Sequence, residues 1–305
     1  MRIGFGLPVA GAWATPATIA HIAERAEQLG YHSLWSFQRL LVGVEQELAP
    51  VYQSVLDPMV SLAYAAARTT RIRLGVAVIN FPFVSPVILA KQAATLDVLS
   101  GGRHELGLGA GWSEVEFAAT GASTRRRGAR AVEYLAVLRT LWADEVSEFD
   151  GEFYTVPPSH MRPKPVQRPG PPVLLGGTAK GALRRAGRHA DGWVSGSTTD
   201  LSQITESIGE VRAAARRAGR DPETVRIVSR GVVAVGEPTT GPDRKPLSGT
   251  YEQIQADARR LGELGVTELF YDLNWDPLIA SPDADPEAAV RRAEEIMGAL
   301  APDAG

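Results

Sequence analysis

Two glycine-rich segments have the composition and spacing of a ligand-binding site. Residues 106–111 read LGLGAG, with three alternating glycines, and residues 176–180 read GGTAK. Glycine allows a ligand to approach the backbone closely. If a helix begins directly after Gly177, its free N–H groups and its dipole suit a phosphate, and Thr178 can cap that helix and also donate to the phosphate. The glycine pair favours a phosphate site over a plain capped helix, whereas residues 106–111 could equally form a tight turn.

The sequence offers few groups for nucleophilic or metal chemistry. It has no cysteine, which excludes thiolate catalysis, disulfides and cysteine-ligated metals. The histidines, at positions 21, 32, 104, 160 and 189, do not have metal-ligand spacing, and G-x-S-x-G, H-E-x-x-H and P-loop motifs are absent. We therefore expect no metal, and we expect that a bound organic cofactor supplies the chemistry.

The overall composition is that of an ordinary globular enzyme. The 305 residues are 44% hydrophobic and 22% charged, with a net charge of −3, which gives no general attraction to nucleic acid or to an anionic membrane. No apolar stretch approaches the ~20 residues of a spanning helix, and Pro8 interrupts the only early apolar run. We expect a cytoplasmic protein with a small-molecule substrate and no nucleic-acid or membrane partner, and with a homodimer as one option.

Short apolar runs alternate with helical patterns along the whole chain. Thr15, Asp57 and Asp285 each precede a proline at a predicted helix start, and capping boxes are predicted at positions 200/203 and 250/253. Regular alternation implies a parallel sheet, and eight units favour a single (β/α)8 barrel, the TIM-barrel fold, over residues 1–305. The expected strands are residues 2–7, 32–37, 72–79, 104–110, 172–175, 192–195, 225–235 and 266–272.

Insertions interrupt this alternation at three places. A hairpin is predicted over residues 148–156, with Asp150-Gly151 as its turn, and residues 236–248 form a polar loop. The connection over residues 38–56 contains Arg39, Glu45, Glu47 and Tyr52. It is too long for a plain connection and begins at the carboxyl end of a strand, where barrel active sites lie. We predict that it is a substrate loop, with a dimer contact as the alternative.

In their joint order, several segments resemble the luciferase-like monooxygenases, particularly the F420-dependent actinobacterial branch of that family. The resemblance covers almost the whole chain. Its strongest parts are RLGVAVINFP (73–82), SPVILAKQAATLDVLSGGR (85–103) and LGLGAGWSEVEFAATG (106–121), with FDGEFY (149–154), PKPVQRPGPPVLLGGT (163–178) and ADGWVSG (190–196) in addition. It implies a (β/α)8 barrel that holds an isoalloxazine or deazaflavin ring across its mouth.

The resemblance also implies positions for the cofactor. Ala77-Val78 matches a non-prolyl cis peptide, or bulge, that presses against the ring, and Ser36 matches a residue near it. Lys180, Arg184 and Arg185 could accept the acidic tail of F420, or they could be solvated residues of a helix. The full set of implied cofactor-binding residues is Ser36, Ala77, Val78, Gly109, Ala110, Gly111, Trp112, Gly176, Gly177 and Thr178.

At one point the sequence departs from its relatives. The F420-dependent sugar-phosphate dehydrogenases of the family have an Asp-His pair after the second strand, and Phe37 and Gln38 stand there instead. Without the histidine, alcohol oxidation lacks its general base, so reduction of a substrate is favoured. Gln38 occupies the catalytic position but is no acid, which leaves water, or the side chains Glu114, Glu116 and Tyr271, as proton donors.

Three functions follow from these patterns. The first is an F420-dependent oxidoreductase, in particular a reductase that transfers a hydride to a small organic substrate. The second is an FMN-dependent monooxygenase on the same scaffold, since the two cofactors share a ring shape and a phosphate. The third is a non-catalytic barrel that has lost the ring site, against which the GAGW and GGT segments argue.

Overall fold

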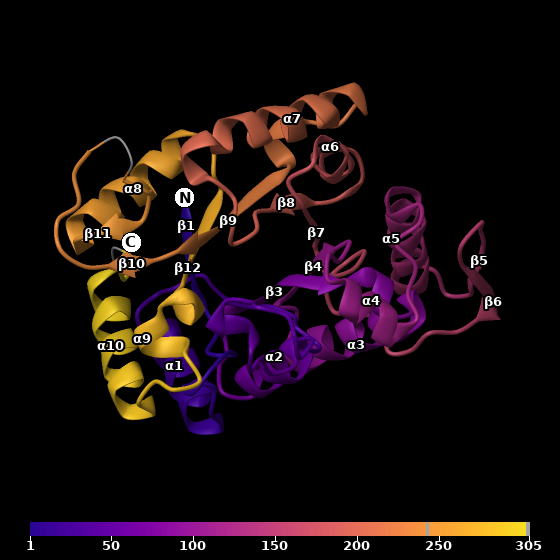
Figure 1. Cartoon of the computed structure of the whole chain (residues 1–305). Coiled ribbons are helices and arrows are strands. Elements are labelled where there is room, and N and C mark those ends of the chain that lie inside the picture. Colours follow the sequence, from indigo (N-terminus) through magenta and orange to yellow (C-terminus); the bar gives the residue numbers. More distant parts are fainter. Residues whose placement is uncertain (242–243, 303–305) are drawn as a thin grey trace.

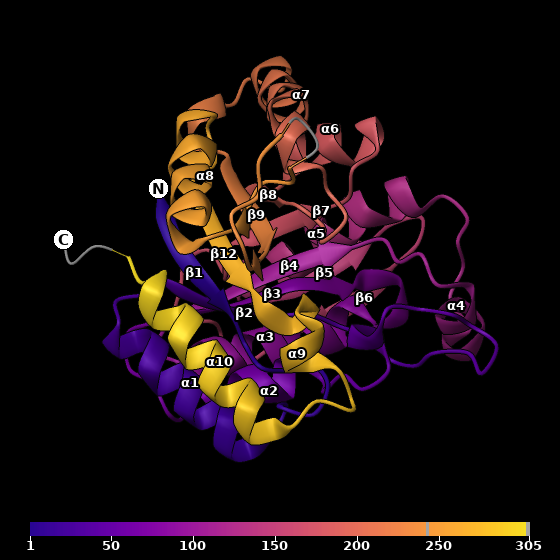
Figure 2. The same ribbon diagram turned by 60° about the vertical axis from the view of Figure 1, so that its left-hand side comes forward.

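Eight parallel strands close into a barrel in the computed structural model, which describes residues 1–241 and 244–302. The strand order around the barrel is β1-β12-β9-β8-β7-β4-β3-β2, with helices on the outside (Figures 1 and 2). The predicted (β/α)8 fold is confirmed. The barrel strands are β1 (Arg2–Gly6), β2 (Ser33–Ser36), β3 (Arg73–Asn80), β4 (His104–Gly109), β7 (Val173–Gly176), β8 (Gly192–Val194), β9 (Arg226–Val232) and β12 (Glu268–Asp272).

Helices follow the strands and form the outer layer. Helices α1 and α10, from the two ends of the chain, lie side by side where β1 pairs with β12 and closes the barrel (Figures 1 and 2). None of the helices in the described ranges is both long and apolar enough to cross a membrane. The helices are α1 (Pro16–Gln28), α2 (Pro58–Ala66), α3 (Pro86–Leu99), α4 (Glu114–Thr120), α5 (Arg127–Ala143), α6 (Lys180–His189), α7 (Ile204–Arg217), α8 (Tyr251–Glu263), α9 (Pro277–Ala280) and α10 (Pro286–Ala299).

Most of the predicted helix starts are confirmed in atomic detail. Thr15, Asp57 and Asp285 each accept a hydrogen bond from the backbone N–H three residues further on, and each precedes a proline. Thr250 and Gln253 form the predicted capping box. These caps satisfy backbone N–H groups that have no partner inside the helix.

Two predicted caps are wrong. Asp200 accepts a hydrogen bond from Ser202 N (2.9 Å), but it begins the short 3-10 helix η3 (Leu201–Gln203), and α7 starts only after that turn. Thr178 does not cap α6, because the helix begins two residues later with Ala179 at the cap position. Gly177 adopts a positive φ of 115°, which bends the chain outward and delays the helix.

Two predicted β segments are also divided differently. The strand expected over residues 225–235 is divided into two. β9 ends at Val232, and the following β10 (Ala234–Val235) leaves the barrel and pairs with β11 (Ser248–Gly249). The expected polar loop, residues 236–248, thus ends in a strand, and its residues 242–243 lie outside the described part. The hairpin of β5 (Ser147–Asp150) and β6 (Thr155–Ser159) beside α5 is confirmed as antiparallel, as Figure 1 shows.

The hairpin turn is longer than the predicted Asp150-Gly151 pair. Gly151 N–H donates to the carbonyl of Tyr154 at 3.0 Å, so four residues connect the strands. The Glu133 carboxylate of α5 accepts from the N–H groups of Phe153 and Tyr154, both at 2.7 Å. This contact with the helix fixes the wider turn, and a reading of local turn preferences cannot detect it.

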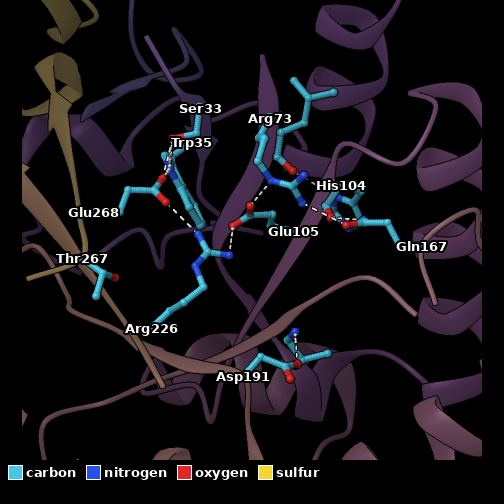
Figure 3. A network of polar contacts seen from close by, with 12 residues as sticks. Ser33, Trp35, Arg73, His104, Glu105, Gln167, Asp191, Arg226, Thr267 and Glu268 are labelled. Atoms are coloured by element: carbon cyan, nitrogen blue, oxygen red, sulfur yellow. Dashed lines mark hydrogen bonds and ion pairs between the residues drawn. The ribbon is translucent and has the colours of Figure 1, made fainter. Parts of the chain in front are cut away.

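The interior of the barrel has an ionic floor. Arg226 contacts Glu105 at 2.8 Å and Glu268 at 2.7 Å, and Arg73 forms a further ion pair with Glu105 (Figure 3). Burial opposes ionisation of Glu105, but Arg226 and Arg73 outweigh it and hold the pKa of that carboxyl below its usual value. Glu268 also accepts from Trp35 Nε1 at 2.9 Å. Two cations and two anions balance, as buried charges must.

An apolar layer lies above this floor. The Trp35 and Phe270 rings stack at 5.3 Å, and smaller side chains fill the rest of the layer. The floor and this layer fill the barrel below the carboxyl ends of the strands, which is where active sites of this fold lie. The members of the layer are Trp35, Ala77, Leu174, Val194, Val228 and Phe270, with Val78 packed against them.

Candidate functional site

The third strand has an irregular backbone at the barrel mouth. The Ala77-Val78 peptide bond is cis, as the resemblance implied, and the pairing of β3 with β4 shifts register between Val76 and Ile79. Ala77 belongs to the apolar layer inside the barrel, and Val78 packs on top of it, half-buried.

Val78 fills a space that neighbouring strands leave open. A Cβ atom at Gly109 would lie 2.4 Å from Val78 Cγ2, and one at Gly107 or Gly176 would lie 3.3 or 3.2 Å from Val78 Cγ1. The glycines of β4 and β7 are therefore needed to make room for Val78. Val78 and these glycines form an apolar surface, here called the platform.

The segment after β4 leads from this platform to the rim. Gly111 has a φ of 71°, and its carbonyl accepts a hydrogen bond from Arg127 Nη1 at 2.7 Å. Ala110 packs half-buried against the core. Trp112 is 53% exposed, and its ring meets Tyr52 of the 38–56 loop at 6.1 Å. Gly109 and Ala110 thus lie at the mouth, and Trp112 lies at its edge.

The glycine turn after β7 ends beside the same platform. Gly177 and Thr178 are exposed, and the Gly177 carbonyl accepts from Trp193 Nε1 at 2.9 Å, which fixes the turn. Ala179, at the cap of α6, has no side-chain acceptor for the first N–H groups of the helix. Ala182 N–H donates to the Ala179 carbonyl at 2.8 Å, so the N–H groups of Lys180 and Gly181 remain available to an anion, together with the exposed Lys180 side chain.

The start of α5 approaches the middle of α6. A Cβ atom at Gly128 would lie 2.9 Å from Arg185 Nη1, and burial lowers the pKa of Arg185. Arg184 differs from the other two basic candidates, because Glu210 of α7 holds its Nε at 2.5 Å. Lys180 and Arg185 are the members of the predicted set that stay without a carboxylate partner among the described residues.

The end of β2 presents an amide where some relatives have a base. Gln38 Oε1 accepts from Asn80 N at 2.9 Å, which ties the end of β2 to the end of β3. Ser36 alternates with the inward-facing Trp35, and its hydroxyl lies 3.4 Å from the Gly75 carbonyl and 3.5 Å from a carbonyl of α2. Ser36 therefore faces a helix, and a contact of its side chain with the ring stays a prediction.

The three predicted proton donors do not meet at the mouth. The Glu116 carboxylate, 1% exposed, pairs with Arg39 at 2.9 Å and accepts from Leu40 N at 2.7 Å. Tyr271 alternates with the inward-facing Phe270 and lies in the core between strands and helices, where burial raises its pKa to about 12. Glu114 is exposed on α4. None of them is aimed at the platform.

Sequence reasoning missed a buried polar group at the mouth. Arg230 of β9 donates to Asp272 of β12 through Nε at 2.6 Å and pairs with it through Nη2 at 2.5 Å. Asp272 in turn accepts from the backbone and side-chain N–H groups of Asn274 (3.0 and 2.8 Å). The guanidinium lies 4.7 Å from the Phe37 ring centroid. A charged residue inside an apolar strand pattern was the available signal.

The 38–56 loop is attached to the rim by aromatic and ionic contacts. The Arg39 guanidinium lies between the rings of Tyr52 (4.6 Å) and Trp112 (4.5 Å), and it is only 7% exposed. Tyr52 also meets Trp275, which follows β12, at 5.4 Å. The loop thus reaches from the end of β2 to the segments that follow β4 and β12, and its role as a substrate loop stays a prediction.

Comparisons with known proteins agree with this architecture. Residues 3–265 match the sequence model of the family described as luciferase-like monooxygenase. An uncharacterised protein of Mycobacterium tuberculosis is 33% identical over 99% of both chains. An FMNH2-dependent dimethylsulfone monooxygenase from Pseudomonas putida is 30% identical over 65% of this chain and 53% of its own length. An F420-dependent glucose-6-phosphate dehydrogenase from Kineococcus radiotolerans is 28% identical over 70% and 63%.

Solved structures share the fold along the whole chain. A monooxygenase from Streptomyces bottropensis superposes with a TM-score of 0.79 at 24% identity, and an F420-dependent secondary alcohol dehydrogenase with 0.78 at 19%, each over 98% of both chains. At these identities the likeness supports the fold alone. On the sequence match and the barrel geometry together, the chain belongs to the luciferase-like monooxygenase family.

Proposed function

We propose that the protein is an F420-dependent oxidoreductase that reduces a small organic substrate by hydride transfer. The Val78 platform fits a planar ring, since Gly107, Gly109 and Gly176 leave no side chains that compete with it. The turn at Gly177 and the start of α6 suit the phosphate. When bound, the deazaflavin supplies the hydride, and the protein supplies orientation and a dry apolar wall.

The observation that carries the choice of F420 is the basic rim beside the glycine turn. Lys180 and Arg185 on α6 lack carboxylate partners among the described residues, and Arg127 at the start of α5 holds the Gly111 carbonyl. FMN ends at its phosphate, whereas F420 continues into an acidic tail. Cations beyond the phosphate turn therefore favour the longer, more acidic cofactor.

Two contacts support reduction over alcohol oxidation. Gln38 takes the place of a histidine base, and its amide oxygen is engaged by Asn80 N–H. Arg230, fixed by Asp272 and in contact with Phe37, provides a buried cation at the mouth. A fixed cation stabilises negative charge that develops on a substrate oxygen as hydride arrives. Water then supplies the proton, because Glu116 and Tyr271 face elsewhere.

A binding experiment tests the cofactor assignment. The protein should quench F420 fluorescence at micromolar concentration and leave FMN nearly unbound. Lys180→Gln combined with Arg185→Gln should weaken F420 binding roughly tenfold and leave binding of the same chromophore without phosphate and tail unchanged. Arg188→Gln, at the other end of α6, is the matched control.

The FMN-dependent monooxygenase is the second candidate, because a relative with that activity matches 65% of the chain. It predicts tight FMN binding and oxygen consumption with reduced FMN. Either result would overturn the F420 proposal. Failure to bind both cofactors would instead support a barrel that has lost its ring site.

A further inference from the structure

A cavity lies at the opposite end of the barrel from the mouth. Its volume is about 360 Å³, which is within the range of small-molecule sites. Val173 and Arg226, the first residues of β7 and β9, line it, as does Asp191, which directly precedes β8. The amino ends of three barrel strands therefore form its inner wall.

Three arginines from separate segments converge on this cavity. They are Arg139 of α5, Arg168 of the loop before β7, and Arg220 of the connection between α7 and β9. Arg139 and Arg220 each donate one hydrogen bond of 2.7 Å to a backbone carbonyl of the α6 region. Within residues 1–241 and 244–302, none of the three forms an ion pair. Most of their donors remain free.

The fourth arginine of the lining, Arg226, is neutralised by carboxylates inside the barrel. Arg226 extends into the barrel between Glu105 and Glu268 (Figure 3), so its charge belongs to the ionic floor. Asp191 is the carboxylate of the lining, and its Oδ2 accepts from Val173 N at 2.8 Å. Three guanidinium groups thus face one carboxylate, in a chain whose net charge is −3.

The pKa of the neighbouring His189 is consistent with this excess of positive charge. Burial lowers the pKa of the His189 imidazole below its ordinary value, and so do four nearby arginines, among them Arg139 and Arg220. Like charges oppose protonation. Prolines at positions 169, 171 and 172 line the cavity beside Arg168 and restrict the backbone of that loop, so a ligand has little of the loop to order.

We propose that this cavity is an anion site that binds a small molecule carrying at least two negative charges on phosphate or carboxylate groups. Guanidinium groups recognise both chemistries through paired N–H donors. The position at the amino ends of the strands makes the site separate from the cofactor mouth, so its occupancy is independent of the cofactor assignment.

Calorimetric titration with pyrophosphate and with citrate, at an ionic strength of ~0.15 M, tests the site. The wild-type protein should bind at least one of the two probes saturably, with a 1:1 stoichiometry. Replacement of Arg139, Arg168 and Arg220 by Gln should weaken that binding roughly tenfold per arginine. If the triple variant does not fold, Arg168→Gln alone, in an exposed loop, should still weaken probe binding by the loss expected for one arginine.

The control removes the same charge elsewhere. Replacement of Arg25, Arg216 and Arg259, which are exposed and outside the lining, should leave probe affinity within about twofold. An equal loss in this control would show general attraction and overturn the proposal. So would the absence of saturable binding of either probe to the wild-type protein, or unchanged affinity in both Arg168→Gln and the triple variant.

Discussion

Arg230 and Asp272 are the buried ion pair closest to the proposed chemistry. Arg230→Lys keeps the charge but loses the two-point contact with Asp272, because an ammonium lacks the planar fork of a guanidinium. We expect the rate of F420H2 oxidation by an active substrate to fall roughly tenfold or more, with unchanged affinity for F420. If cofactor affinity falls in parallel with the rate, Arg230 belongs to the cofactor site and not to the reaction.

Gly109 offers a second test at this scale. Its Cβ would lie 2.4 Å from Val78 Cγ2, so Gly109→Ala must displace the platform, and we expect roughly tenfold weaker cofactor binding by fluorescence titration. Gly209, on α7, has open space around it, and Gly209→Ala should leave binding unchanged and preserve or raise the melting temperature. Equal cofactor affinity in the two variants would remove Val78 from the site.

The sequence predicted some of the residues at the barrel mouth but did not predict others. The alternating glycines of residues 106–111 suited a ligand contact and a tight turn equally well, and the structure places Gly107 and Gly109 against Val78. The family resemblance located Ala77-Val78. Arg230 and Asp272 were missed because they are 42 positions apart, and only the pairing of β9 with β12 brings them together. The surroundings of Tyr271 and Glu116 depend on tertiary contacts in the same way: Tyr271 lies in the core, and Glu116 pairs with Arg39.

Among the elements, the 38–56 loop depends most on one contact. Glu116 neutralises the buried Arg39 and also accepts from Leu40 N. Glu116→Gln leaves that arginine without its counter-charge, and an unpaired buried charge is strongly unfavourable. We expect faster hydrogen–deuterium exchange across residues 38–56 and weaker substrate binding, with unchanged F420 affinity.

Glu114→Gln is the matched control for this change. Glu114 lies two residues away on the same helix and is exposed, so its replacement should not alter exchange in the loop. If both variants accelerate exchange equally, the loop is not held by Glu116. If neither does, the aromatic contacts of Tyr52 are sufficient to hold it.

Capping preferences predicted the first residue of a helix correctly where the capping residue lies directly before it. Proline after Thr15 or Asp57 permits few other readings. The rules failed at Thr178, because Ala179 takes the cap position of α6, and at Asp200, because a 3-10 turn at residues 201–203 lies between it and α7. β10 could not be separated from β9 by pattern, since both are apolar and only the pairing with β11 distinguishes them.

At the scale of the whole molecule, closure of the barrel was predictable but its outer contacts were not. Eight βα units make closure the favoured arrangement, and the pairing of Arg2 with Glu268 completes it. Association between molecules depends on which helix faces remain uncovered, and that requires coordinates. Adjacent helices α2 and α3 expose Val60 and Tyr64, and Val87 and Ile88, respectively.

We predict that this face is the contact surface of a homodimer. Helix α2 contains no charged residue, and a helix with apolar residues on its outer side as well as its inner side is expected to be covered. A second copy fits because a two-fold axis places the same apolar side chains on both sides. The double variant Val60→Asp and Ile88→Asp should be a monomer when its mass is measured by light scattering. Val146→Asp, an exposed position beside the hairpin, should leave the dimer intact.

Since Asp57 caps α2 directly after the 38–56 loop, loss of the dimer should also accelerate hydrogen–deuterium exchange in that loop. A monomeric wild-type protein would contradict this assignment, and so would a dimer that persists when both Val60 and Ile88 are replaced. In either case the dimer contact would be excluded as a role for the 38–56 loop, and the substrate-loop prediction would remain.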